Sequence, residues 1–268
     1  MPILNITQEG RLYYDIKGAP PPAPPVLFLN GTAQTTLTWT HLVRALAGDC
    51  QTICYDARSQ GRKSVLGQGR LSLDLHLKDL LSLLDHLGLA RPHLVGMSHG
   101  ALLALALSAR HPERAASMVL INPGNPAGGR TRTVLRAWRE VLAQGGMQAA
   151  AWAMLPLVLG GTYLKSRQAL LTGMAEAIAV RNRPESLESH LAAMAEYPAF
   201  STFTESDLPP TLLVTGGDDP LNDPQWIDRL VAECAAEHLH LADAGHSLPV
   251  EAPRRCSEIL KTWLAAHS

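Results

Sequence analysis

A serine, an aspartate and a histidine are the first candidates for chemistry, because each closely follows a run of β-type residues. Ser98 stands in "HLVGMSHGALL", with Gly96 and Gly100 on either side. Asp219 follows "TLLVTGGD", and His246 follows "HLHLADAG". A serine hydroxyl is a poor nucleophile at neutral pH and needs a histidine as general base, which in turn needs an acid to orient it. The pattern predicts that Ser98 attacks a carbonyl carbon.

The two glycines beside Ser98 indicate an abrupt turn from strand to helix. Such a turn holds its central residue in a strained conformation and exposes the side chain above the sheet. Side chains two residues before and after would collide with neighbouring backbone, and Gly96 and Gly100 avoid this collision. The first turn of the following helix also offers unpaired N–H groups to an oxyanion beside the serine. The chain order Ser, Asp, His is the one associated with this architecture.

Neighbouring residues leave alternatives open. Asp218 adjoins Asp219, and the residues alone do not decide which of them orients the histidine. His99 adjoins Ser98, but neighbouring side chains at a helix start diverge, so we expect its imidazole to border the pocket instead of acting as the base. Asp56 and Arg58, in "DARSQGRKS", are expected to form a structural ion pair or a hydrogen-bonded turn.

Strand-like and helix-like segments alternate along the chain and would position these residues. Short aliphatic runs that end in glycine, asparagine or aspartate follow an opening hairpin over residues 4–18, and helical segments separate most of them. The clearest helix covers residues 72–89, where leucines repeat at the helical period. The alternation predicts an α/β fold with a doubly wound, mostly parallel, eight-stranded sheet, and places the chemistry at the carboxyl ends of its strands.

One interval breaks the alternation and predicts a helical lid inserted after the sixth strand. Residues 124–208 contain no evident strand and suggest several short helices, which leaves residues 1–123 and 209–268 as the core. Met147, Trp152 and Met154 lie in this interval and are candidates for lining a substrate pocket. Packing between helices is the alternative explanation for these large apolar side chains.

Composition limits the class of partner. Hydrophobic residues at 46% and a formal net charge of −1 give the chain no electrostatic reason to bind nucleic acid or an anionic membrane. The first residues lack the pattern of a signal peptide, so we expect a cytoplasmic protein, monomeric or homodimeric. Its four cysteines, Cys50, Cys54, Cys234 and Cys256, lack metal-ligand spacing and are expected to be reduced thiols. The expectation is therefore a small-molecule substrate and no metal or organic cofactor.

Taken together, the motifs resemble those of the α/β-hydrolase superfamily along essentially the whole chain. The resemblance is carried by "NGT", "DARSQGRKS", "GMSHG", "GGDDP" and "AGHSLPVEAP". It implies that Ser98 is the nucleophile, His246 the base and Asp219, the acid just before a proline, the orienting acid. It also implies that the backbone N–H groups of Thr32 and His99 form the oxyanion hole.

The loop that contains Thr32 departs from the commonest family pattern. Asn30-Gly31 replaces the usual His-Gly and resembles enol-lactonases and the hydroxyacyl-hydroxyalkanoate synthase of rhamnolipid formation. Asn30 and Gly31 are therefore further pocket candidates, although an asparagine here can instead brace the loop by hydrogen bonds.

The resemblance implies a serine hydrolase that cleaves an ester, lactone or thioester through an acyl-enzyme. Two alternatives remain open from the sequence. One is an acyltransferase or synthase with a hydroxylated acceptor, and the other is a ligand-binding protein of low turnover on the same fold.

Overall fold

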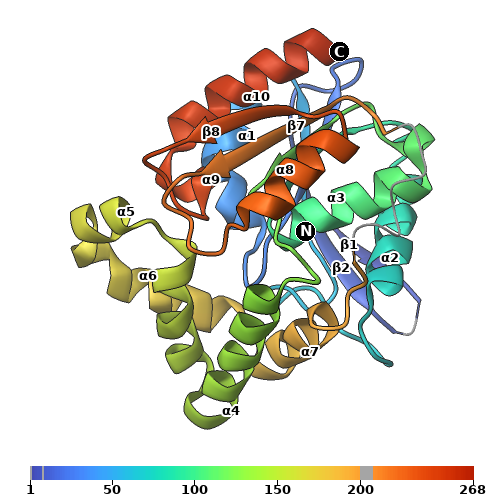
Figure 1. Cartoon of the computed structure of the whole chain (residues 1–268). Coiled ribbons are helices and arrows are strands. Elements are labelled where there is room, and N and C mark those ends of the chain that lie inside the picture. The colour runs from blue at the N-terminus through green and yellow to red at the C-terminus, as the bar shows by residue number, and fades with distance from the viewer. Residues whose placement is uncertain (1, 8, 200–207) are drawn as a thin grey trace.

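A twisted eight-stranded sheet forms the centre of the computed structural model, which describes residues 2–7, 9–199 and 208–268 (Figure 1). Within these residues the strand order is β1-β2-β4-β3-β5-β6-β7-β8, in which the pairs β1–β2 and β2–β4 are antiparallel and the others are parallel. The strands are β1 (Ile3–Asn5), β2 (Arg11–Gly18), β3 (Pro25–Leu29), β4 (Gln51–Asp56), β5 (His93–Met97), β6 (Met118–Ile121), β7 (Thr211–Gly216) and β8 (Glu237–Leu241). The predicted fold class and opening hairpin are confirmed.

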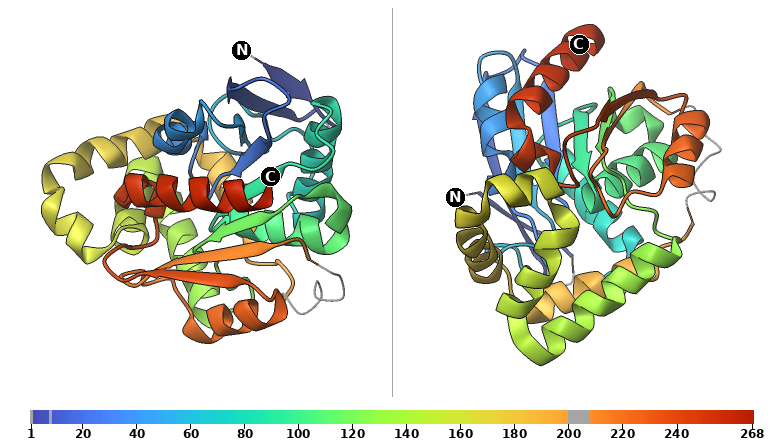
Figure 2. Two further views of the ribbon diagram at one scale, coloured as in Figure 1. Left: turned by 90° about the horizontal axis from the view of Figure 1, so that it is seen from above. Right: turned by 60° about the vertical axis from the view of Figure 1, so that its left-hand side comes forward.

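Alternating side chains bury both faces of the sheet. On β3, Val26 and Phe28 join one apolar cluster, whereas Leu27 and Leu29 join the other. Helices α1 (Thr40–Leu46) and α10 (Pro253–His267) cover the first face, and α2 (Leu73–His86), α3 (His99–Arg110) and α8 (Pro224–Glu233) cover the second (Figure 2). The short helices η1 (Thr36–Trp39), η2 (Pro112–Arg114) and α9 (Leu248–Glu251) lie in connections.

The predicted leucine-striped helix is α2. Ser72 caps its first turn by accepting a hydrogen bond from the N–H of Leu75 at 3.1 Å. A buried ion pair fixes α2 to the loop after β4, because the Arg58 guanidinium donates to both carboxylate oxygens of Asp79 at 2.7 Å. Of the two predicted alternatives, an ion pair between Arg58 and Asp56 is therefore wrong. The carboxylate of Asp56 accepts instead from the backbone N–H of Thr36 at 2.7 Å.

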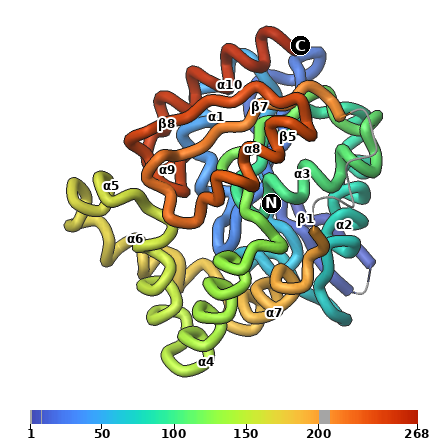
Figure 3. The backbone as a smooth tube through the Cα atoms, in the orientation of Figure 1, coloured from blue at the N-terminus to red at the C-terminus, as the bar shows by residue number. Residues whose placement is uncertain are grey.

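Among the described residues between β6 and β7 there are four helices, and we call them the inserted helices. They are α4 (Gly129–Val158), α5 (Gly161–Ser166), α6 (Gln168–Arg181) and α7 (Pro184–Met194). Figure 3 traces the chain out of β6 into this group, which gathers at one end of the sheet. Residues 200–207, at the end of the predicted insertion, lie outside the described residues.

The first inserted helix is longer than the expected short helices. Helix α4 has 30 residues and is interrupted at Gly146, where φ is 66° and ψ is −169°. Glycine adopts this left-handed conformation without steric cost, so two helical segments follow each other directly across the kink. Helix α4 is the one described helix that is long and apolar enough to cross a membrane. Helices in the interior of soluble proteins meet the same two criteria, length and composition. The four cysteines are free and buried, as predicted.

Candidate active site

Ser98 occupies the turn between β5 and α3 in a strained backbone conformation. Its φ is 53° and its ψ is −116°, outside the regions that non-glycine residues favour. The Ser98 N–H donates to the carbonyl of Ile121 on the neighbouring strand at 2.8 Å, and the Ser98 carbonyl accepts from the N–H of Ala101 at 3.0 Å. These two bonds hold the turn against both the sheet and the helix.

The glycines beside the turn are required by close backbone approach. A Cβ atom on Gly96 would lie 2.4 Å from the carbonyl oxygen of Gly100, and one on Gly100 would lie 2.0 Å from that of Leu29. Both separations are far below van der Waals contact. The sequence-based explanation of the two glycines is confirmed.

His246 and Asp219 meet at the carboxyl ends of β8 and β7. The Nδ1 atom of His246 lies 2.8 Å from Oδ2 of Asp219, and both side chains are buried. The other carboxylate oxygen of Asp219 accepts from the N–H of Leu221 at 2.8 Å. Asp218 points elsewhere and accepts from the N–H of Thr162 on α5 at 3.3 Å. Of the two adjacent aspartates, Asp219 is the one that orients the histidine ring.

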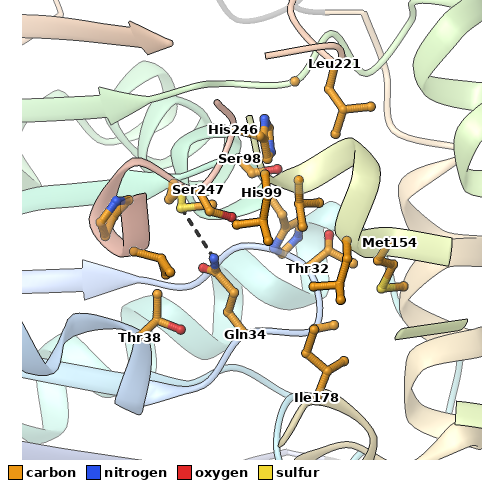
Figure 4. A pocket seen from close by; sticks show the side chains of 18 of the residues that line it. Thr32, Gln34, Thr38, Ser98, His99, Met154, Ile178, Leu221, His246 and Ser247 are labelled. Atoms are coloured by element: carbon orange, nitrogen blue, oxygen red, sulfur yellow. Dashed lines mark hydrogen bonds between the residues drawn. The ribbon is translucent and has the colours of Figure 1, made fainter. Parts of the chain in front are cut away.

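The same ring borders Ser98. Both side chains line one cavity, and Figure 4 shows the Ser98 hydroxyl next to the His246 ring. Because Nδ1 contacts Asp219, Nε2 is the nitrogen left to face the cavity. This arrangement can take a proton from a serine hydroxyl and return it to a leaving group.

Thr32 and His99, whose backbone N–H groups were predicted to form the oxyanion hole, both line the cavity. His99 is the first residue of α3, and Thr32 stands in the loop after β3. In the described part of the chain, neither N–H has a hydrogen-bond acceptor. The Thr32 hydroxyl donates to Sδ of Met194, at the end of α7, at 3.2 Å. The two free N–H groups can stabilise negative charge on a carbonyl oxygen beside Ser98.

The cavity has a volume of about 410 Å³ and lies between the core and the inserted helices. Its polar end holds Ser98, His246 and Thr32 (Figure 4). Away from these residues the wall is mostly apolar and includes Leu102, Val134, Leu135, Met154, Leu155 and Ile178. A cavity of this size and lining accommodates a small molecule with an apolar part.

Comparison with known proteins agrees with this architecture. The model of the alpha/beta hydrolase family matches residues 26–259. The chain belongs to the alpha/beta hydrolase family. A relative from Pantoea ananatis, named as a carbamate hydrolase, RutD, is 26% identical over 260 residues, which cover 94% of this chain and 93% of that protein.

Solved structures show the same fold. A thermophilic esterase from Thermogutta terrifontis superimposes with a TM-score of 0.88 and 23% identity over 100% of both chains. An enol-lactonase from Burkholderia xenovorans gives a TM-score of 0.87 and 23% identity over 98% of this chain and 100% of its own. The chain is thus an enzyme of the hydrolase type, similar to proteins named for carbamate, ester and lactone chemistry.

Several predicted pocket residues of this hydrolase lie outside the cavity wall. Trp152 is 42% exposed because its face of α4 points to solvent, and Met147 is buried in the main apolar cluster. The Asn30 side chain donates to the carbonyl of Tyr55 at 2.9 Å and accepts from the indole of Trp39 at 2.7 Å, so it braces the strands.

Two further predicted residues complete the comparison with the cavity wall. The N–H of Gly31 donates to the side chain of Gln34 at 2.8 Å, and Gly31 is not a lining residue among those described. Met154 does line the cavity, and Figure 4 shows its side chain at the wall formed by the inserted helices.

Two residues that the sequence analysis missed, the buried Asn122 and the partly buried Glu251, hold the loops of the site. Asn122 donates to the carbonyls of Gly245 and His246 at 3.1 and 2.8 Å and accepts from the N–H of Gly216 at 2.9 Å. Its position directly after a buried strand is the signal that could have identified it. Asn122 thereby ties the loop after β7 to the loop that carries the histidine.

Glu251 fixes the histidine loop from its other side. Its carboxylate accepts from the N–H groups of Gly160, Gly245 and Ser247 at 3.0, 2.9 and 3.0 Å. Burial raises the pKa of Glu251, and the three N–H donors oppose that rise. Because Gly160 precedes α5, this carboxylate also joins the inserted helices to the site.

Three buried histidines behind the turn are the described residues whose donor atoms lie close enough together to hold a metal ion. They are His76 on α2, His99 on α3 and His190 on α7. Burial lowers the pKa of His99 well below its usual value, and the nearby His190 and His76 lower it further. A lowered pKa weakens His99 as a proton acceptor, and its ring nitrogen Nε2 contacts Tyr197 at 2.9 Å, so His99 is poorly suited as the general base.

Proposed function

We propose that this enzyme is a serine hydrolase that cleaves a carboxylic ester, lactone or thioester through an acyl-enzyme. The observation that carries the proposal is the strained Ser98, placed in one cavity with a histidine whose other nitrogen lies 2.8 Å from a buried carboxylate. A strained nucleophile, a base and an orienting acid are what acyl transfer by serine requires.

In the proposed reaction His246 takes the proton of Ser98 at Nε2 while the serine oxygen bonds to the substrate carbonyl carbon. Asp219 keeps the proton of the ring on Nδ1 and stabilises the imidazolium that forms. The N–H groups of Thr32 and His99 hold the oxyanion of the tetrahedral intermediate. His246 then protonates the leaving oxygen or sulfur, and water repeats the sequence on the acyl-enzyme.

The apolar wall of the cavity supports a substrate with an apolar acyl group of short to medium length. Apolar residues from α4 and α6 enclose the end of the cavity away from Ser98. We propose that the inserted helices act as a lid over this end, because binding then removes the acyl chain from water. The enol-lactonase and esterase that share the fold, and the carbamate hydrolase named among the relatives, set the range of carbonyl compounds to examine.

Labelling with a fluorophosphonate probe tests the nucleophile. We expect the wild-type protein to be labelled and the Ser98→Ala variant to remain unlabelled. Ser108→Ala is the matched control, because Ser108 is a buried serine on α3, away from the cavity, and its removal leaves the label in place. Labelling of Ser98→Ala at the wild-type rate would overturn the proposal.

A substrate panel on the wild-type enzyme then identifies the carbonyl compound. The panel contains p-nitrophenyl esters of increasing acyl length, lactones, acyl thioesters and aryl carbamates. We expect an optimum at short to medium chains, and equal rates at every length would contradict the role of the apolar wall. Condensed product with added alcohols would indicate an acyltransferase, and one slow turnover with retained product would indicate a ligand-binding protein.

A further inference from the structure

Three helices that are distant in sequence each place one histidine in the same buried cluster. His76, His99 and His190 are 1%, 0% and 1% exposed, and one ring nitrogen from each lies within 4.8 Å of the others. We call this group the histidine cluster. Its ring centroids are 5.2 Å apart for His76 and His99, 5.8 Å for His76 and His190, and 4.4 Å for His99 and His190.

The cluster contains polar nitrogens without partners. Both nitrogens of His76, Nδ1 of His99 and Nδ1 of His190 are buried and meet no partner with the geometry of a hydrogen bond among the described residues. The backbone of Asn30 nevertheless lies close enough to the His99 ring to raise its pKa. A buried polar atom without a partner loses its hydrogen bonds to water and gains none in return, so several such atoms in one place are unfavourable. Each neutral ring carries one lone pair, and an occupant that accepts electron pairs could contact one nitrogen of all three rings.

The opposite nitrogens of two rings do have partners. Nε2 of His99 lies 2.9 Å from the hydroxyl of Tyr197, and Nε2 of His190 lies 3.4 Å from that of Thr32. Histidines that bind a metal through one nitrogen usually engage the other nitrogen in such a contact, which fixes the tautomer and the ring orientation. The contacts therefore leave Nδ1 of His99 and Nδ1 of His190 available as ligand atoms.

We propose that His76, His99 and His190 bind one divalent transition-metal ion, with zinc as the first candidate. Three imidazoles on a tetrahedral zinc ion, with Zn–N of about 2.0–2.1 Å, place their ring centroids roughly 5.2 Å apart. The measured separations of 4.4 to 5.8 Å bracket this spacing. Imidazole nitrogen is a good ligand for zinc, copper and nickel, and poor for magnesium or calcium.

Burial favours the neutral form of these rings, so a cation can bind them without first displacing a proton from the ring. It lowers the pKa of His76 to about 3 and that of His190 to about 4, so both rings are neutral near neutral pH. Arg58 is the charged neighbour that also lowers the pKa of His76, and its charge is matched by the Asp79 carboxylate at 2.7 Å. Pairing with Asp79 limits the repulsion that Arg58 exerts on a bound cation.

The proposed ion would tie the inserted helices to the core. His190 lies on α7, whereas His76 and His99 lie on α2 and α3 of the core. His99 also lines the cavity and carries one of the two free N–H groups beside Ser98. A metal in the cluster thus stabilises the wall of the cavity. The histidine cluster could not be predicted from the sequence, because zinc sites are recognised there by short spacings between ligands, which these three residues lack.

Titration of metal-free protein with Co²⁺ tests the proposal. The protein is the full chain, purified without a histidine tag and stripped with a chelator. We expect one equivalent of Co²⁺ to give the visible absorption of a tetrahedral site, Zn²⁺ to abolish that absorption, and Zn²⁺ to raise the melting temperature.

Four variants locate the ion. His76→Leu removes two buried nitrogens without partners, and His190→Leu removes one such nitrogen and one long contact with Thr32 at 3.4 Å, so both variants are expected to fold. Both are expected to lose the cobalt absorption and the zinc-dependent rise in melting temperature. His93→Gln changes a buried histidine outside the cluster, bonded to Ser117 at 2.8 Å, and is expected to bind Co²⁺ as the wild type does. The double variant His238→Gln/His240→Gln removes an exposed pair on β8 and is expected to bind equally well.

The outcomes are decisive in either direction. Circular dichroism first establishes whether each variant is folded. If one leucine variant does not fold, the other one is enough to locate the ion. The proposal would be overturned if a folded leucine variant kept the wild-type absorption. It would also be overturned if only removal of the exposed pair on β8 abolished the absorption, or if the wild type bound no stoichiometric Co²⁺. Because every readout is spectroscopic or thermal, failure here is distinguishable from failure of the proposed serine chemistry.

Discussion

Asp218 and Asp219 are adjacent in sequence, but their carboxylates contact different parts of the site. The Asp219 carboxylate contacts the ring of His246, whereas that of Asp218 accepts from the N–H of Thr162. An orienting acid acts by holding the histidine in the tautomer that leaves Nε2 able to accept a proton. An amide at the same place can present its NH₂ group to the ring and favour the wrong tautomer.

Exchange of each aspartate for asparagine separates the two residues. We expect Asp219→Asn to lower kcat/KM by about 10³–10⁴-fold with little change in fold, because the amide nearly matches the carboxylate in shape. Asp218→Asn is expected to stay within a few-fold of wild type. Steady-state kinetics on the best ester of the panel measures both. Equal losses in the two variants would contradict the assignment of Asp219.

Residues with local signals were predictable, and residues defined by distant partners were not. Ser98 and His246 each follow a strand and stand beside glycine, so the sequence alone could place them at one edge of the sheet. Asn122 and Glu251 act through contacts with loops elsewhere in the chain, and the one local signal is the position of Asn122 directly after β6. Trp152 was misplaced because helical periodicity does not tell which face of an inserted helix meets the core.

At the scale of elements, the contact between β5, α3 and β3 makes the turn at Ser98 possible. Helix α3 begins directly after the strand and lies so close to β3 that its second residue, Gly100, touches the carbonyl of Leu29. Alternation of strands and helices made this junction predictable. The length of α4 was not predictable, because the pair Gly145-Gly146 is typical of a helix end. In the structure the chain resumes helical geometry directly after Gly146.

Substitution of one glycine tests the packing of the junction. A Cβ atom at Gly100 would lie 2.0 Å from the carbonyl oxygen of Leu29, and neither backbone can move without separating α3 from β3. We expect Gly100→Ala to lower the free energy of unfolding by about 3 kcal/mol or more, and to abolish labelling of Ser98. Gly48→Ala is the control, since a Cβ there meets nothing within 4 Å. A Gly100→Ala protein as stable as this control would show that the junction is loosely packed.

At the scale of the whole molecule, the histidine cluster links the inserted helices to the stability of the core. Burial lowers the pKa of His76 to about 3, and the neighbouring His190 and Arg58 contribute further, while burial lowers the pKa of His190 to about 4. In the unfolded chain these rings return to the ordinary value of 6.5. The unfolded state therefore binds more protons at mildly acidic pH, so stability is complete above about 6.5 and falls as pH decreases below it.

The pH dependence of unfolding measures this contribution. For the metal-free protein in the presence of a chelator, each buried histidine should remove about 1.4 kcal/mol of unfolding free energy for every pH unit below 6.5. We expect the His76→Leu variant to lose one such contribution and to show a correspondingly shallower slope between pH 6.5 and 5 in urea titrations. The exposed His41→Gln variant serves as control and should keep the wild-type slope. If His76→Leu keeps that slope as well, the ring of His76 takes up its proton within the folded protein, and the cluster is more open to water than its burial indicates.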